Sequence, residues 1–298
     1  MNYKEFGKLI KVLRKEQVDP VAAKSWTQKM LADKLNVSLR TVEEVERGTK
    51  GNLNPQLLMG VAKVFKLTSM ERIKLLGLAT SMDESSMVAH TVSAEQMQQY
   101  VHTFVCGIQL PFVVYDPLYN MVLCNQPFLQ FHGVTEGFLD HASTDPARFN
   151  ILRFFFAPDS PYLTIRKTIP EEHILSSLQY FRGLSFEHRH AAVYASLLSA
   201  LHRYPGFSKY WEMIKHEERE LFFRWQGEEF QHSILGAVSY IVTTTIVLAM
   251  PYNLYLSIYV PKSKATQQIF TELSFESHES IQHLALFPNS KMTNSRFV

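Results

Sequence analysis

The chain has 298 residues, of which 46% are hydrophobic and 19% charged, an ordinary composition for a globular protein with a sizeable core. Its net charge of +2 is unevenly spread. Residues 1–82 carry 15 Lys and Arg against 8 Asp and Glu, whereas residues 83–298 carry 15 against 20. A basic N-terminal part on an acidic remainder is typical of a phosphate-binding module joined to a domain that does not bind nucleic acid.

Cysteine content and the first residues bear on the compartment. The two cysteines, Cys106 and Cys124, lack the spacing of a metal site, and a pair gives no disulfide framework. This usage favours a reducing compartment. The first five residues contain no apolar run of the kind that a signal peptide needs. We therefore expect a cytoplasmic protein.

Apolar periodicity in the first 82 residues predicts an all-α domain of five helices. The expected helices cover residues 3–16, a pair within about 28–47, residues 55–65 and residues 69–79. Thr27 is a good N-cap for the first helix of the pair, and Ser38 for the second. Gly48 suits the position just after a helix end. Two short helices joined by a tight turn are the geometry that places a helix in a DNA major groove.

The spacing of this helix pair resembles that of the Cro/C1 or XRE helix-turn-helix family of transcriptional regulators. The matching positions are Gln28, Ala32, Leu35, Val37, Ser38, Thr41, Val42, Glu46 and Gly48. The longer connection at residues 17–25 departs from the shortest repressors, and we interpret it as a loop insertion. The resemblance covers about the first 80 residues. It implies sequence-specific binding of double-stranded DNA, with a dimer on a palindromic operator.

The resemblance assigns expected contacts to individual side chains. Gln28 would donate to the phosphate backbone. The second helix of the pair would present its outward face to base edges or phosphates, through Ser38, Leu39, Arg40, Thr41 and Glu44. Arg40 is the best candidate for reading sequence, because a guanidinium can bond guanine O6 and N7 together. Lys50 and Asn52 precede the fourth helix, whose N-terminus suits a phosphate.

Each of these contacts has a plainer alternative. Arg40 and Lys50 could be merely solvated charges. Glu44 could accept from a cytosine amine, or repel phosphate and so narrow the sequences tolerated. Glu46 occupies the position of a structural carboxylate in the family, and the resemblance implies that Arg14 is its partner. We therefore assign Arg14 and Glu46 to stability rather than to DNA contact.

The remainder predicts an α+β domain. After a linker at residues 83–99, which becomes helical from about Ala94, a hairpin is expected at residues 111–124 and an Asn125-capped helix follows. Four helical segments come next, at residues 149–156, 171–182, 186–204 and 207–220. Strands are expected at residues 221–230, 235–250 and 253–260, then a short helix at 266–273 and a tail. Residues 234–250 are uncharged, but their β-branched content and short length favour strands over a membrane span.

This order resembles the PAS-like sensor domain of MmyB-type transcriptional regulators. The similar segments are residues 110–125, 148–156 and 205–211. The predicted organisation is a DNA-binding domain at 1–82, a linker at 83–99, a PAS-like sensor domain at 100–262, and a C-terminal helix and tail at 263–298. The resemblance implies a small apolar, fatty-acid-like ligand, whereas Cys124 stands where family members have Trp.

Aromatic side chains are the candidates for lining such a ligand site. The predicted ligand-binding residues are Phe112, Tyr115, Cys124, Phe128, Phe131, Trp211, Tyr240 and Tyr255. Plain core packing is the alternative for each, and a body that serves only in oligomerisation is the alternative for the domain. An enzyme is the third reading. It finds little support, because the common nucleophile, metal and phosphate-loop motifs are missing and His188 and His190 point to different faces of a helix. We expect no cofactor and no metal.

Overall fold

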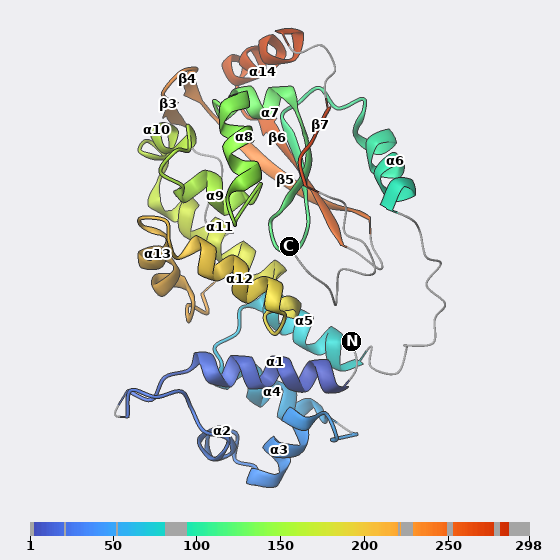
Figure 1. The fold of residues 1–298 in the computed structure, drawn as a ribbon, viewed down its shortest axis with the longest axis vertical. Coiled ribbons are helices and arrows are strands. Elements are labelled where there is room, and N and C mark those ends of the chain that lie inside the picture. The colour runs from blue at the N-terminus through green and yellow to red at the C-terminus, as the bar shows by residue number, and fades with distance from the viewer. Residues whose placement is uncertain are drawn as a thin grey trace. The chain divides into compact units, whose positions relative to one another are not determined.

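The structure is a computed structural model that describes residues 3–20, 22–51, 53–80, 94–219, 221, 229–248, 253–276 and 281–285 (Figure 1). The chain forms two compact units. The first contains Met1–Val88, Gln179–Leu198 and Trp211–Glu220. The second contains Ala89–Leu178, Ser199–Tyr210 and Leu221–Val298. The domain limits expected from the sequence divide the chain by family resemblance and stay predictions.

Five α-helices open the first unit, as the sequence predicts. They are α1 (Tyr3–Glu16), α2 (Gln28–Leu35), α3 (Leu39–Arg47), α4 (Pro55–Val64) and α5 (Ser69–Thr80). Their apolar faces form one cluster of buried side chains that includes Leu9, Leu31, Val42 and Leu75. The helix pair α2–α3 thus stands on a common core.

Local signals set the limits of the helix pair. The Thr27 hydroxyl accepts a hydrogen bond from the Met30 amide at 3.2 Å, and the Ser38 hydroxyl accepts one from the Thr41 amide at 3.1 Å. Gly48 ends α3 with φ at +69°, a left-handed conformation that disfavours other residues. A Cβ atom at Gly48 would lie 2.6 Å from backbone atoms of Lys4. The glycine therefore allows both the turn and the close approach of α1.

A five-stranded antiparallel sheet forms the centre of the second unit, in the order β5-β6-β1-β2-β7. Its strands are β1 (Phe112–Tyr115), β2 (Met121–Asn125), β5 (Tyr240–Leu248), β6 (Leu254–Pro261) and β7 (Ile281–His283). The short strands β3 (Phe230–His232) and β4 (Gly236–Val238) pair separately. The fold class is therefore helical followed by mixed α and β, in agreement with the sequence.

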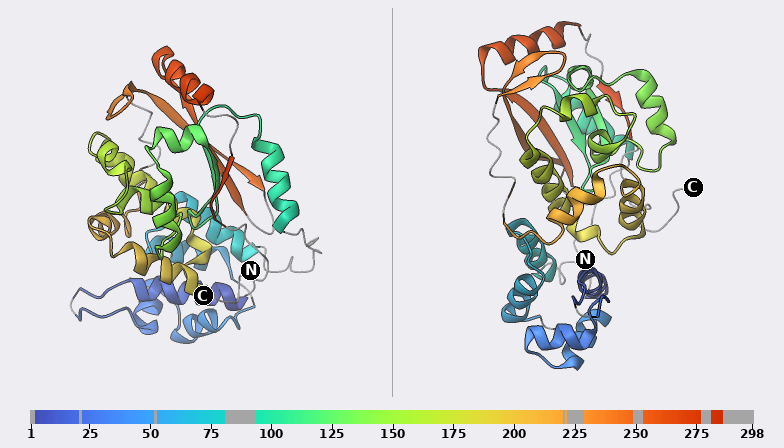
Figure 2. Two further views of the ribbon diagram at one scale, coloured as in Figure 1. Left: turned by 45° about the horizontal axis from the view of Figure 1, so that its top comes forward. Right: turned by 90° about the vertical axis from the view of Figure 1, so that its left-hand side faces the viewer.

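Helices flank this sheet. Against one face, α6 (Ala94–Val105) buries Met97, Val101 and Val105 together with strand residues such as Leu254 and Leu256. The opposite side carries α7 (Gln126–Phe131), α8 (Glu136–Thr144), α9 (Ile151–Phe156) and α10 (Tyr162–Arg166) (Figures 1 and 2). The last helix, α14 (Lys264–Glu276), packs against α7 and β6.

Three helices contribute residues to both units. They are α11 (Glu171–Leu184), α12 (Ala192–Leu201) and α13 (Phe207–Ile214), and the short 3-10 helix η2 (Phe186–His188) lies between α11 and α12. In α11, residues 171–178 belong to the second unit and residues 179–184 to the first.

Several predicted elements differ from the structure. The single helix expected at residues 186–204 is divided into η2 and α12, and the helix expected at 207–220 ends at Ile214. The strand expected at 235–250 is divided into β4 and β5 because the Ser239 amide donates to Thr266 Oγ1 at 2.9 Å instead of continuing a ladder. Helices α8 and α10 and strand β7 were not expected. Most of the strand expected at 221–230 lies outside the described residues.

Among the residues that the structure describes, no helix is both long enough and apolar enough to cross a membrane.

Candidate nucleic-acid interface and aromatic core

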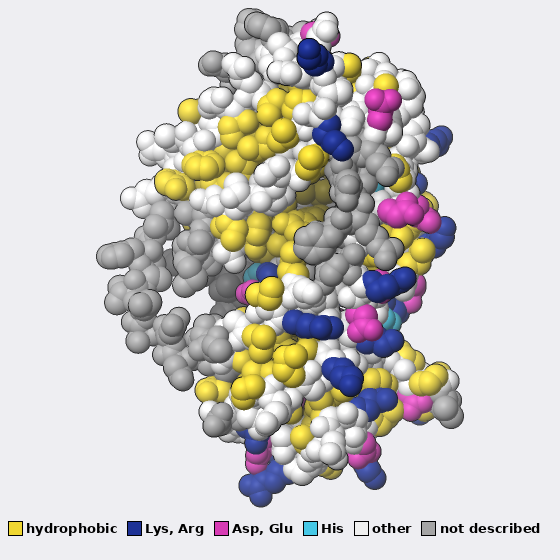
Figure 3. All heavy atoms as spheres, turned by 180° about the vertical axis from the view of Figure 1, so that it is seen from behind, with side chains coloured by type: hydrophobic (Ala, Val, Ile, Leu, Met, Phe, Trp, Pro, Cys, Tyr) yellow, Lys and Arg dark blue, Asp and Glu magenta, His cyan; other side chains and the backbone are white. Residues whose placement is uncertain are grey.

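The outward face of α3 is open to solvent. The side chain of Arg40 is 85% exposed, Leu39 is 43% exposed and Ser38 is also exposed. Thr41 and Glu44 are half-buried on the same helix. Lys and Arg side chains, interspersed with Asp and Glu, lie around α2 and α3 at the bottom of Figure 3. The structure thus brings five predicted contact residues together on one helix and its cap.

Glu44 lies between two cations on this face. Its carboxylate accepts from Arg40 Nε at 2.8 Å and lies 4.0 Å from Lys50 Nζ. The hydrogen bond from Arg40 lowers the pKa of Glu44, so the carboxylate stays ionised. The contact uses Nε of Arg40, which leaves the two terminal nitrogens for the bidentate geometry that guanine requires. Asn52 lies outside the described residues.

Formal charge on α3 together with its flanking residues is balanced. Residues 38–50 contain three cations and three carboxylates. A second surface pair, Arg47 with Glu43 at 3.2 Å, was missed in the sequence although its i,i+4 spacing was readable. Because residues 38–50 carry no net charge, attraction to phosphate has to come from cations elsewhere in the basic first unit. Arg40 is then better suited to specificity than to bulk affinity.

Arg14 and Glu46 form the pair that the resemblance implies. Arg14 Nε and Nη2 donate to the two oxygens of Glu46 at 2.6 and 2.9 Å, and both residues are buried. Arg14 also donates to the carbonyl oxygen of Trp26. Gln28 donates to Glu46 Oε2 at 2.8 Å, so one N–H of its amide is already used within the fold. The group connects α1, α2 and α3 behind the outward face.

Six of the predicted ligand-binding residues lie in the second unit, on one face of the sheet and on α7. Tyr115 stacks on Tyr255, with ring centroids 5.8 Å apart, and the β1–β2 register places Cys124 on the same face of the sheet as Tyr115. Phe131 meets Tyr240 edge-on at 5.4 Å, and Phe128 lies on the same helix. Two predicted residues lie elsewhere. Phe112 faces α6 on the opposite side of the sheet, and Trp211 belongs to the first unit, against Phe181.

A polar centre that the sequence did not reveal lies among these rings. His132 Nδ1 lies 2.8 Å from the Phe128 carbonyl, which assigns the proton to Nδ1, and Nε2 can accept from the Tyr259 hydroxyl at 3.4 Å. Burial lowers the pKa of His132 to about 4 and raises the pKa of Tyr259 well above its usual value. Tyr162 lies beside His132, with centroids 5.2 Å apart. Because these groups are uncharged at neutral pH, the cluster suits an apolar or neutral polar ligand.

The exposed face of α3 on a compact helical core defines the first unit as a helix-turn-helix module. Comparison with protein families agrees: a helix-turn-helix family matches residues 22–73. A second family, described as the MmyB-like transcription regulator ligand binding domain, matches residues 98–273. The chain therefore belongs to the MmyB-like family of transcription regulators and is a DNA-binding regulator with a ligand-binding domain. No curated protein gives a significant match to the chain.

Proposed function

We propose that the chain controls transcription as a dimer bound to a palindromic operator, with α3 of each copy in a major groove. The observation that carries the proposal is the exposed face of α3, where Arg40 donates a hydrogen bond to Glu44 and keeps its terminal nitrogens exposed. One such module makes few phosphate contacts, so two copies on one duplex supply the affinity that a single copy lacks.

The roles of individual side chains follow from their placement. Arg40 would read guanine, and Leu39 would contact a thymine methyl. Glu44 would orient Arg40 and disfavour sequences that bring a phosphate close to it. Gln28 retains a second amide hydrogen for a phosphate, while Ser38 and Thr41 offer hydroxyl groups that lie 2.9 Å from each other. Lys50 and Asn52 would contact the backbone near the start of α4.

The operator and the dimer can be tested in one experiment. The full chain is used to select sequences from a pool of random duplexes, and the selected duplex is then titrated in a gel shift with mass-calibrated complexes. We expect a two-fold symmetric consensus bound by two copies. A complex with one copy per operator would contradict the dimer, and recovery of no consensus would contradict sequence-specific reading.

We further propose that the second unit binds a small apolar ligand of the fatty-acid type among the aromatic side chains around Phe131 and Tyr240. The uncharged cluster of rings that includes His132, Tyr162 and Tyr259 supports a ligand held mainly by apolar contact and hydroxyl donors. Native mass spectrometry of freshly purified protein tests this proposal. A bound apolar mass that is lost in a Phe131→Trp variant would support it. Protein that stays empty across growth conditions would favour a domain used only for oligomerisation.

A further inference from the structure

A short segment of the ligand-binding family's sequence forms part of the DNA-binding unit. Residues 179–190, named here the docking segment, contain the end of α11 and all of η2. Phe186 of this segment is fully buried and belongs to the same core cluster as Leu9 of α1 and Leu75 of α5. The apolar core of the helix-turn-helix unit is therefore completed by a side chain from far along the chain.

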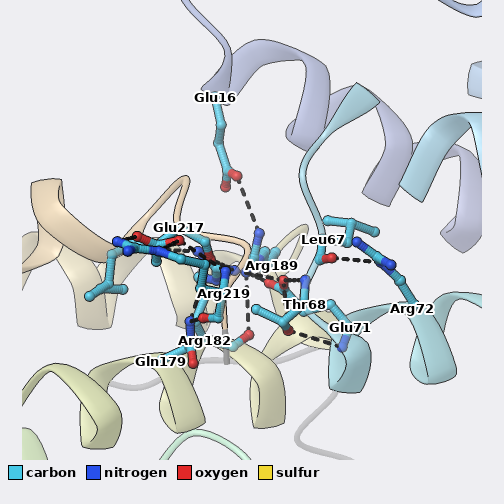
Figure 4. Close-up of polar contacts among 11 residues, drawn as sticks. Glu16, Leu67, Thr68, Glu71, Arg72, Gln179, Arg182, Arg189, Glu217 and Arg219 are labelled. Atoms are coloured by element: carbon cyan, nitrogen blue, oxygen red, sulfur yellow. Dashed lines mark hydrogen bonds and ion pairs between the residues drawn. The ribbon is translucent and has the colours of Figure 1, made fainter. Parts of the chain in front are cut away.

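Glu71 of α5 is the centre of the polar contacts with this segment (Figure 4). The Thr68 amide donates to Glu71 Oε2 at 2.8 Å, and Thr68 Oγ1 accepts from the Glu71 amide, a capping box at the start of α5. The same carboxylate also accepts from Arg182 at 2.9 Å and from Arg189 at 2.5 Å. Burial alone would raise the pKa of Glu71, but the two guanidinium groups outweigh it and hold that pKa below its usual value. The carboxylate is thus an ionised bridge between α5 and the docking segment.

Both arginines reach beyond Glu71. Arg182 donates to the carbonyl oxygens of Ile214 and Glu217, the latter at 2.9 Å, which satisfies backbone groups at the end of α13. Arg189 reaches Glu16 at the end of α1, at 3.4 Å, and also donates to the Arg182 carbonyl. Removal of Arg189 would take the guanidinium donor from Glu71 Oε1 and from Glu16, and removal of Arg182 would leave Glu71 with one guanidinium in place of two, so the charges favour one docked arrangement.

Further polar contacts join the edges of the docking segment to α5 and α1. Lys74 donates to the Leu184 carbonyl at 2.9 Å and pairs with Glu187 at 3.4 Å. His190 Nε2 lies 2.5 Å from a carboxylate oxygen of Glu5 on α1. The docking segment is therefore fixed to both α1 and α5 by an apolar anchor surrounded by polar contacts, the arrangement of a specific interface.

These contacts leave the DNA-reading surface uncovered. They use α1 and α5, whereas Leu39 and Arg40 of α3 remain exposed. Docking of the segment therefore does not exclude DNA by covering the reading helix.

Helix α11 continues without interruption from the docking segment into the second unit. There Ile174 and Leu178 are buried, and the Ser177 carbonyl accepts from the Tyr119 hydroxyl at 3.3 Å. A helix hydrogen-bonded throughout its length transmits displacement of one end to the other as a rigid element.

We infer that the docking segment is the coupling element through which the ligand-binding domain acts on the DNA-binding helices, by fixed attachment to α1 and α5 through Phe186 and Glu71. The inference rests on the proposed binding of DNA and of a ligand by the two units. By reciprocity of linked binding, DNA on α3 then alters the affinity of the second unit for its ligand, and we expect α11, as the coupling element, to respond to DNA. The coupling is thereby open to measurement without knowledge of the ligand.

Hydrogen exchange of the full chain, with and without a pool of random-sequence duplexes, tests the inference. In the wild type we expect DNA to slow exchange in α3 and to change exchange of residues 171–178 by about fivefold or more, the lower end of typical coupling. In Glu71→Gln the α3 response should persist while the α11 response disappears. Glu212→Gln, which breaks the i,i+3 pair of Glu212 on α13 with Lys215 just after it, is the matched control and should behave as the wild type.

The possible results separate failure of the coupling from failure of DNA binding. If DNA protects α3 but leaves residues 171–178 unchanged in the wild type, or if Glu71→Gln keeps the α11 response, the coupling is overturned and the DNA-binding proposal stands. If α3 itself shows no protection, the DNA-binding proposal fails and coupling falls with it. Should Glu71→Gln not fold, Phe186→Leu replaces it, because it shrinks the apolar anchor and keeps every charge; an α11 response retained there would overturn the coupling.

Discussion

Replacement of Arg14 by Met tests the buried ion pair that holds the helix-turn-helix together. The side chain of Arg14 is 9% exposed and that of Glu46 is 3% exposed, so the pair is shielded from water. Removal of one partner of a buried pair typically costs ~3–5 kcal/mol, because the other charge stays buried without compensation. Since Gln28 would still donate to Glu46, we place Arg14→Met at the lower end, at about 3 kcal/mol.

Thermal and denaturant unfolding of the full chain, followed by circular dichroism, measures this cost. A loss of about 3 kcal/mol corresponds to a fall in the melting temperature of the first unit by roughly 10 °C. The double variant Arg14→Met/Glu46→Met should lose less than the sum of the two single variants, because no charge is then left buried. Arg47→Met is the control; its pair with Glu43 is exposed and should contribute at most about 0.5 kcal/mol.

An Arg14→Met variant that loses less than about 1 kcal/mol, or single costs that add in the double variant, would contradict a stabilising role for the pair. Either result would mean that the pair does not stabilise the arrangement of α1, α2 and α3, and that Glu46 is available for another role.

Three further changes have defined outcomes. Gly48→Ala should cost ~1–3 kcal/mol in denaturant unfolding, because the left-handed backbone and the approach of α1 both exclude a Cβ, whereas Gly51→Ala should be nearly neutral. Asn125→Ala should cost more than the ~1 kcal/mol of an ordinary cap in the same assay, since Asn125 caps α7 and also accepts from the first amide of β1. His132 has a folded pKa of about 4, below the unfolded value, so unfolded chains bind its proton first and stability falls by up to about 1.4 kcal/mol per pH unit between about pH 6.5 and pH 4. Denaturation at pH 7 and pH 5 should show a smaller loss in His132→Phe and an unchanged loss in the exposed control His141→Gln.

The parts of the fold that depend on local chemistry could be predicted from the sequence. The hydroxyls of Thr27 and Ser38 accept hydrogen bonds from amides three residues further along the chain. Gly48 adopts the left-handed conformation that ends α3, which a residue without a Cβ does at little cost. Asn125 acts in the same way at α7. The exposed side of α3 could be predicted from the positions of its apolar residues, because in an amphipathic helix the polar face lies opposite the buried apolar stripe.

Elements set by contacts between distant residues could not be predicted. The division of residues 186–204 into η2 and α12 has no Gly or Pro to mark it; it arises where Phe186 enters the core of α1 and α5 and Arg189 turns toward Glu71. Ser239 separates β4 from β5, since its amide donates to Thr266 of α14 instead of to a neighbouring strand. The polar centre at His132 could not be predicted from the sequence either, since its partners Tyr259 and Tyr162 come from β6 and α10, far along the chain.

The most direct test of the account compares the sequences selected from random duplexes by the wild type, by Arg40→Ala and by Arg203→Ala, an exposed arginine of the second unit. If α3 reads DNA, Arg40→Ala should lose preference for guanine at one position of each half-site, worth ~1–3 kcal/mol of discrimination, and keep the rest of the consensus. Arg203→Ala should select the wild-type sites. Unchanged selection by Arg40→Ala, or weakening that is uniform over all sequences, would contradict the assignment of α3 as the reading helix.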